Sequence, residues 1–238
     1  QHISTDSLIL DMCAAPGGKS TLISQYLSDN GLLICNEFIR SRSQILAENI
    51  HKWGNDNVIV TNNSPHDYES LVGLFDAVLV DAPCSGEGMF RKDEVAITEW
   101  SLFNVQQCAI RQQDILKSAW KCLKDNGILI YSTCTYNSQE NEENVQWLCK
   151  MFGAEPLTIQ VDPKWGVTES EQGYHFYPHK TEGEGFFLAV LRKPKSIEQP
   201  LKIKSKQRHK DKKLISLENY IKETLSFELI EKKQLIYA

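Results

Sequence analysis

The sequence has no apolar run close to the ~18 residues that a helix needs to cross a bilayer, so we expect no membrane-spanning segment. Its first six residues contain neither the basic nor the apolar stretch of a signal peptide, so we also expect no export signal. There is no initiating Met, and a strand-like apolar run starts already at Leu8. We therefore expect a fragment of a longer protein.

Several ligand-binding patterns are missing as well. Neither G-x-G-x-x-G nor G-x-x-x-x-G-K-[ST] occurs, which argues against an NAD-dependent oxidoreductase and against a P-loop enzyme. The seven cysteines form no C-x-x-C pair and no cluster with His at zinc spacing, so we expect no metal site. Because they are scattered and odd in number, they indicate reduced thiols and a cytoplasmic protein.

Charge is divided unevenly along the 238 residues, whose formal net charge is −5. Residues 1–192 carry 14 Lys or Arg and 25 Asp or Glu, whereas residues 193–238 carry 12 and 6. A body this acidic cannot hold a polyanion through its overall field. Any nucleic acid must therefore be held by local patches, by the basic tail or by a domain outside this sequence.

Strand-like and helix-like patterns alternate up to about residue 160, which is typical of an α/β fold with a parallel sheet and crossover helices. The predicted strands span residues 8–12, 32–36, 58–61, 77–81, 128–132 and 186–191. The predicted helices span residues 19–27, 40–53, 102–123 and 139–151. We expect Asp125-Asn126-Gly127 to end the third helix, Ser138 to cap the fourth, and residues 162–184 to be mainly loop.

We predict a large domain over residues 1–193, a polar and basic linker over residues 194–213, and the start of a C-terminal module over residues 214–238. The apolar residues of the segment 214–230 have helical spacing. The basic run between Lys202 and Lys213 fits contact with RNA phosphates and a solvated linker about equally well.

Two cysteines follow predicted strands directly. Cys84 lies in Asp81-Ala82-Pro83-Cys84-Ser85-Gly86, and Cys134 lies in Tyr131-Ser132-Thr133-Cys134-Thr135-Tyr136. In an open α/β sheet, the loops past the strand ends form the active site, so we expect both thiols in one cleft. A thiol there can become a nucleophile when its pKa is lowered. Two partly buried structural thiols are the alternative.

The first predicted strand leads into Cys13-Ala14-Ala15-Pro16-Gly17-Gly18-Lys19, where glycines let the backbone approach a ligand and a helix start favours polar groups. Glu37 follows about twenty residues later, where an acid can bind ribose hydroxyls. Arg42 could brace this acid, and Asp81 could orient a ligand or exchange a proton. A tight turn, a solvated acid, a surface Arg and a loop-capping Asp are the structural alternatives.

Taken together, these segments resemble the RNA 5-methylcytosine methyltransferases of the Sun/Fmu and nucleolar-protein type. The resemblance is greatest to the bacterial branch that modifies small-subunit ribosomal RNA, and it covers about residues 8–192. The matching motifs are Leu10 to Ser20, Asn36-Glu37 with Arg42, Asp81 to Gly88, and Tyr131 to Tyr136. His179-Lys180 with Gly185-Phe186-Phe187 is similar to the closing segment of that family.

The resemblance implies a Rossmann-like fold for an S-adenosylmethionine-dependent methyltransferase, with seven strands, of which the last is antiparallel. It makes Cys134 the nucleophile that attacks a cytosine and Cys84 the residue that helps to free the product. Relatives often offer an Asp toward the adenine where this sequence has Ser64, so a hydroxyl, an Asn amide or the backbone would have to serve here. The family also implies an RNA-binding role for the C-terminal module.

The predicted site residues come from the matched motifs. The cofactor-binding set is Cys13, Ala14, Ala15, Pro16, Gly17, Gly18, Lys19, Glu37, Arg42, Ser64 and Asp81, with Glu37 on the ribose. The catalytic set is Cys134, Cys84, Asp81 and Lys19. The resemblance also implies RNA as partner, as small-subunit ribosomal RNA or the assembling subunit. We expect no membrane partner, and a monomer.

Two other functions stay open. A DNA cytosine-5 methyltransferase would use the Pro-Cys thiol, so Cys84 rather than Cys134 would be essential. A cofactor-binding assembly factor for ribosomal RNA would have lost catalysis, although the presence of both cysteines with Lys19 and Asp81 argues against it.

Overall fold

The computed structural model describes residues 2–195, 230–232 and 235–237, and the chain divides into two compact units, residues 1–198 and 199–238. In the second unit, β10 (Ile230–Lys232) and β11 (Leu235–Tyr237) pair antiparallel. The predicted basic linker lies outside the described residues apart from its first two positions. The predicted helical segment 214–230 lies outside them too, apart from Ile230, which begins a strand instead of continuing a helix.

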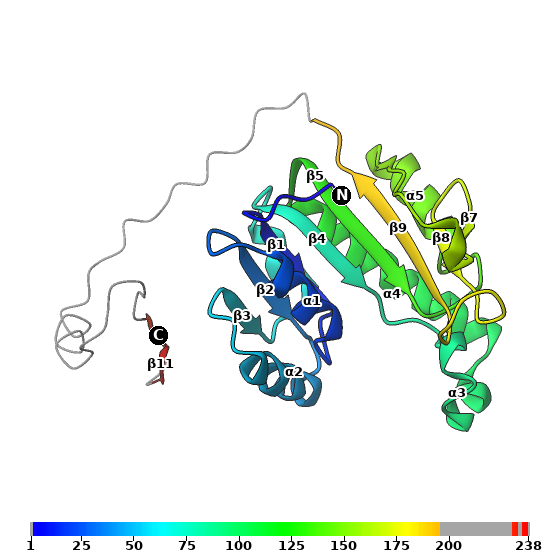
Figure 1. The fold of residues 1–238 in the computed structure, drawn as a ribbon, viewed down its shortest axis with the longest axis horizontal. Helices are drawn as coiled ribbons and strands as arrows, with labels where there is room; N and C mark the ends of the chain where they lie inside the picture. The colour runs from blue at the N-terminus through cyan, green and yellow to red at the C-terminus, as the bar shows by residue number, and fades with distance from the viewer. Residues whose placement is uncertain (1, 196–229, 233–234, 238) are drawn as a thin grey trace. The chain divides into compact units, whose positions relative to one another are not determined.

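Five parallel strands form the centre of the sheet in the first unit (Figure 1). In spatial order they are β3 (Val58–Thr61), β2 (Leu32–Asn36), β1 (Leu8–Asp11), β4 (Phe75–Asp81) and β5 (Leu123–Thr133). Their runs of Val, Ile and Leu are typical of parallel strands that are covered on both faces. β9 (Phe186–Arg192) runs antiparallel to β5, and β8 (Tyr174–Phe176) runs antiparallel to β9.

These seven strands are the Rossmann-like sheet that the motifs imply, with β9 as its antiparallel strand. Two further strands of two residues each, β6 (Glu155–Pro156) and β7 (Thr168–Glu169), bring the total to nine rather than seven. Residues 162–184, predicted as mainly loop with room for a short strand, contain the two strands β7 and β8, which are too short to show an alternating pattern.

The helices lie on both faces of the sheet, as Figure 1 shows for α1 and α4. The helices are α1 (Gly18–Tyr26), α2 (Arg40–Trp53), α3 (Glu94–Glu99), α4 (Leu102–Cys122) and α5 (Glu142–Phe152), with short 3-10 helices η2 (Glu87–Met89) and η3 (Pro163–Trp165). Leu46 of α2 belongs to one apolar core layer, and Leu116 of α4 with Leu148 of α5 belongs to the other. Among the described residues, no helix has the length and apolar character of a membrane span.

Two predicted boundaries are wrong for local reasons. Helix α4 passes directly into β5, and Asp125-Asn126-Gly127 lies inside that strand, where the register against β4 is irregular. The turn signal there marks a bulge, with Asn126 at a φ of +62°. Helix α5 begins at Glu142 with Asn141 as its N-cap, because residues 138–141 form a turn that buries Glu140. Ser138 therefore does not cap this helix.

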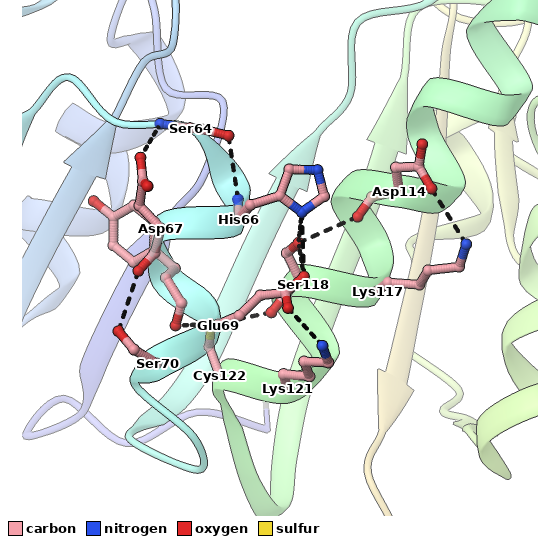
Figure 2. Close-up of polar contacts among 11 residues, drawn as sticks. Ser64, His66, Asp67, Glu69, Ser70, Asp114, Lys117, Ser118, Lys121 and Cys122 are labelled. Atoms are coloured by element: carbon pink, nitrogen blue, oxygen red, sulfur yellow. Dashed lines mark hydrogen bonds and ion pairs between the residues drawn. The ribbon is translucent and has the colours of Figure 1, made fainter.

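A further 3-10 helix, η1 (Pro65–Ser70), holds the loop that follows β3 (Figure 2). Ser64 is its N-cap: the Ser64 hydroxyl accepts a hydrogen bond from the backbone N–H of His66 at 3.3 Å. In return, the Asp67 carboxylate accepts the backbone N–H of Ser64 at 2.8 Å. This reciprocal arrangement is a capping box, and it fixes the backbone of Ser64.

Glu69 attaches η1 to α4, as the ion pair and hydrogen bonds in Figure 2 show. Its carboxylate accepts hydrogen bonds from Lys121 at 2.5 Å and from the Ser118 hydroxyl at 2.9 Å, and lies 3.2 Å from Nδ1 of His66. The hydrogen bonds from Lys121, His66 and Ser118 lower the pKa of Glu69 to about 2 from its ordinary 4.5. The charged carboxylate is therefore the form that stabilises this contact.

We predict that Glu69→Gln removes part of the acid sensitivity of the fold. A lowered pKa contributes stability above pH 4.5 that disappears as the pH falls toward 2, because the unfolded chain then binds the proton more readily. Urea unfolding should show the wild-type protein losing more stability than Glu69→Gln between pH 6 and pH 3. Equal losses in the two proteins would contradict this assignment.

Candidate functional site

The loops past the carboxyl ends of the parallel strands are joined to one another by hydrogen bonds. Asn36, at the end of β2, donates from Nδ2 to the carbonyl of Met12 at 3.2 Å and to that of Asn63 at 3.0 Å. This links the loops after β1, β2 and β3. The loops after β4 and β5 are linked in the same way by Ala82 N–H to the Ser132 carbonyl at 2.9 Å. The loops that carry most of the predicted site residues therefore lie at one edge of the sheet.

The loop of residues 13–19 is held by hydrogen bonds from α2 and leaves space beside Gly18. The guanidinium of Arg42 donates to the Ala15 carbonyl at 2.9 Å, and Asn49 donates to the Pro16 carbonyl at 2.8 Å. Gly17 has a φ of +111°, and a Cβ there would lie 3.2 Å from Leu46, so glycine is required. A Cβ at Gly18 would meet nothing within 4 Å. The backbone there can therefore be approached by a ligand.

Glu37 and Arg42 form the second part of the site. Glu37 is buried, and its Oε1 accepts the backbone N–H of Ile39 at 2.9 Å. Its Oε2 lies 3.7 Å from the guanidinium of Arg42. Arg42 therefore contacts both the acid and the glycine loop.

Lys19, in the first turn of α1, and Asp81, the last residue of β4, form an ion pair. Nζ of Lys19 lies 2.7 Å from Oδ2 of Asp81, and the Ser132 hydroxyl donates to Oδ1 at 2.7 Å. The same ammonium lies 5.0 Å from the ring centre of Phe186, at the start of β9. Both oxygens of Asp81 are thus held by neighbouring donors, which fixes the direction of the carboxylate.

The two predicted cysteines lie in direct contact. Their sulfurs are 3.1 Å apart, so the structure brings Cys84 and Cys134 into one site. Both thiols are half-buried. Gly88 also binds the Cys134 loop, because its N–H donates to the Cys134 carbonyl at 2.7 Å and a Cβ on Gly88 would lie 2.6 Å from that oxygen. The loop after β4 therefore packs tightly against the loop after β5.

The sulfur contact makes the two thiols unequal. The hydrogen bond from Cys84 lowers the pKa of Cys134, since it stabilises the Cys134 thiolate. The same hydrogen bond, together with burial, raises the pKa of Cys84. Of the two thiols, Cys134 therefore loses its proton more readily. The described residues contain no group of three or more His, Cys, Asp or Glu placed to hold a metal ion.

The site can be compared with known proteins. A protein-family model described as "16S rRNA methyltransferase RsmB/F" matches residues 2–192. The chain belongs to this family. The prediction from the motifs is confirmed, including the bacterial branch.

Named members of the RsmB/F family support the assignment. Ribosomal RNA small subunit methyltransferase F of Aeromonas salmonicida is 40% identical over 202 residues, which are 82% of this chain and 42% of the relative. The protein of the same name from Pectobacterium atrosepticum is 39% identical over 201 residues, with the same coverage. The chain thus spans less than half the length of these relatives.

Solved structures confirm the methyltransferase fold. NSun6 from Pyrococcus horikoshii, solved with SFG, is 33% identical with a TM-score of 0.70, over 81% of this chain and 49% of that one. PH0851 has a TM-score of 0.73 at 24% identity, over 78% of this chain and 42% of that one, and so supports the fold alone.

Sequence reasoning missed two polar residues that support the RsmB/F site. Ser132 donates a hydrogen bond to Asp81. The two residues lie opposite each other in the register of β4 and β5, which the sequence of either strand alone does not give. Asp11 ends β1 with a side chain that is 1% exposed. The Ser20 hydroxyl donates to its Oδ2 at 2.6 Å, whereas its Oδ1 is buried without a hydrogen-bond partner. Burial raises the pKa of Asp11 to about 7, against the smaller opposing effect of Ser20.

We predict that the wild-type protein becomes less stable as the pH rises toward 7, and that Asp11→Asn removes this decline. Between pH 3.8 and 7 the folded protein keeps a proton on Asp11 that the unfolded chain releases, so stability falls as the pH rises. The shift from 3.8 to about 7 corresponds to about 4 kcal/mol, at about 1.4 kcal/mol per pKa unit. Urea unfolding at pH 4, 6 and 8 should show this decline in the wild type and a flatter profile in Asp11→Asn. If stability changes with pH in the same way in both proteins, the assignment to Asp11 is wrong.

Proposed function

We propose that this chain is the catalytic part of an S-adenosylmethionine-dependent RNA methyltransferase that methylates carbon 5 of a cytosine in 16S ribosomal RNA. The observation that carries the proposal is the sulfur pair of Cys84 and Cys134, 3.1 Å apart beside the Lys19–Asp81 ion pair. The family assignment and the names of the relatives support it. We further propose that Cys134 acts through a covalent adduct with the base.

The residues of the glycine loop fit the cofactor. The open space at Gly18 suits a backbone that touches a ligand, and the buried Glu37 carboxylate suits ribose hydroxyls. Residues 13–19, Glu37, Arg42, Ser64 and Asp81 would hold S-adenosylmethionine. When bound, the cofactor supplies an electrophilic methyl group.

Nucleophilic catalysis explains the need for a thiolate. Carbon 5 of cytosine is a weak nucleophile, and addition of the Cys134 sulfur to carbon 6 converts the ring into an enamine-like nucleophile. Carbon 5 then takes up the methyl group and loses its proton to a base. The electron pair of that C–H bond re-forms the ring double bond, and the Cys134 thiolate leaves. We assign the help in this release to Cys84, whose sulfur touches that of Cys134.

Asp81 and Lys19 would act on the base as the thiolate adds. Asp81, when protonated, can donate a hydrogen bond to ring nitrogen 3, and the Lys19 ammonium next to it stabilises developing negative charge. A cytosine reaches this cleft only after it leaves its stack, which favours unpaired RNA. The partner is therefore RNA of the small subunit or the assembling subunit.

Several features of the whole protein stay predictions. We propose a catalytic domain over residues 1–193, a linker over residues 194–213 and an RNA-binding module that begins at residue 214. We also propose that the protein is cytoplasmic, monomeric and free of membrane partners.

Covalent trapping tests the proposal. Full-length protein with Cys84→Ser should form an adduct with cytosine-containing ribosomal RNA and S-adenosylmethionine that survives a denaturing gel, because release is blocked after the thiolate has added. Cys134→Ser should form none. As a matched control, Cys108→Ser, on α4, should behave as wild type.

The other outcomes decide between the alternatives. An adduct with Cys134→Ser and none with Cys84→Ser would establish the arrangement of a DNA cytosine-5 methyltransferase. No adduct and no methylation with any RNA, despite cofactor binding, would favour the assembly factor.

We predict that Ser64→Ala weakens S-adenosylmethionine binding, measured by calorimetry. The substitution removes the polar side chain where relatives offer an Asp toward the adenine, and with it the cap of η1, worth about 1 kcal/mol. Ser70→Ala is the control, because the Ser70 hydroxyl donates only within the same helix, to the Asp67 carbonyl. Equal affinities for Ser64→Ala and Ser70→Ala would remove Ser64 from the cofactor site.

A further inference from the structure

Glu140 is a buried carboxylate that the reaction described above does not use. The sequence places it among the acidic residues of a helix start, but its side chain is 0% exposed. It lies in the turn between the Cys134 loop and α5. A buried carboxylate needs several hydrogen-bond donors, so its partners indicate what it does.

Three donors surround this carboxylate. Oε2 accepts the backbone N–H of Ser85 at 3.0 Å and Nε2 of Gln112 at 2.7 Å, and Oε1 accepts Nδ2 of Asn137 at 2.8 Å. Ser85 follows Cys84 directly, and Asn137 belongs to the loop of Cys134. Glu140 therefore joins the two cysteine loops.

Gln112, on α4, strengthens the same connection. Its Nε2 also donates to the carbonyl of Pro83 at 3.0 Å, so both residues that flank Cys84 are held. Its Oε1 accepts hydrogen bonds from the Tyr131 hydroxyl at 3.1 Å and from Asn144 at 2.8 Å. The orientation of the Gln112 amide is thereby fixed, with its donors toward Pro83 and Glu140.

We propose that Glu140 is the positioning residue of the cysteine pair, whose buried carboxylate holds the Cys84 loop against the Cys134 loop and so keeps the two sulfurs in contact. The inference rests on the proposed function only for the catalytic roles of the two cysteines. Glu140 touches neither sulfur, and it acts through the backbone of Ser85 and the side chain of Asn137.

A carboxylate suits this position better than an amide. All three partners are donors, and a carboxylate accepts at both oxygens, whereas Gln would direct an N–H group at one of the donors. Hydrogen bonds to a charged acceptor are also shorter and stronger than those to a neutral one. The isosteric change Glu140→Gln therefore releases part of the contact while it keeps the volume.

Thiol alkylation of the free protein tests the proposal without RNA or cofactor. The rate of Cys134 alkylation by iodoacetamide, followed by mass spectrometry against pH, reports its thiolate. The groups that act on Cys134 are Cys84, Asp81 and Lys19. We expect Glu140→Gln and Cys84→Ala each to move the midpoint upward, and the double variant to match Cys84→Ala.

The double variant and a matched control make the test specific. Glu143→Gln removes the same charge from the first turn of α5, next to the turn of Glu140, but Glu143 is exposed and accepts a hydrogen bond from Ser138, so its profile should equal wild type. An unchanged profile for Glu140→Gln would overturn the proposal. An equal shift in the presence and absence of Cys84 would also overturn it, because the effect would not pass through the sulfur contact.

If Glu140→Gln fails to fold, a second variant tests the same connection. Gln112→Met keeps the volume and removes the donors to Glu140 and Pro83, and it should raise the midpoint in the same direction. An unchanged midpoint in a folded Gln112→Met would overturn the proposal. If Glu140→Gln shifts the midpoint but covalent trapping fails for Cys134, the proposed function fails and the positioning role stands.

Discussion

The parallel pairing of β4 with β5 is the constraint on which the site depends. In this register Asp81 lies opposite Ser132, and both strands leave the sheet at the same edge. Cys84 and Cys134 follow shortly after these two residues, so the register brings the starts of their loops to the same place. The Lys19 ammonium then joins the loop after β1 to the same edge. A shift of β5 by one residue would turn its side chains to the other face and separate the thiols.

The interior next to the cysteine loops is polar, in contrast to the apolar core of the rest of the sheet. Gln112, Asn141, Asn144 and Glu140 are fully buried, next to Tyr131. Their donors and acceptors are matched to one another, so burial leaves them satisfied. A satisfied network permits few alternative arrangements, and so it gives the loops a single geometry rather than a large gain in stability.

Sequence reasoning reached the parts of this molecule that local patterns determine. The bounds of α2, Arg40 to Trp53, follow from its apolar spacing and from Gly54 in the left-handed conformation. The motif residues lie where strand ends place them, and Cys84 meets Cys134. The start of α5 was wrong because tertiary burial of Glu140 overrides the cap signal of Ser138. Ser132 and Asp11 were missed, since their roles depend on partners in other strands or helices.

The contact between the sulfurs joins segments that are far apart in the sequence. Cys84 and Cys134 are 50 residues apart in sequence, and Lys19 and Asp81 are 62 apart. Such distant contacts form only after loop closure, so the sulfur contact cannot form within any short segment of the chain. The distinctive chemistry of Cys134 therefore belongs to the paired strands β4 and β5, and no local segment of the chain can have it alone.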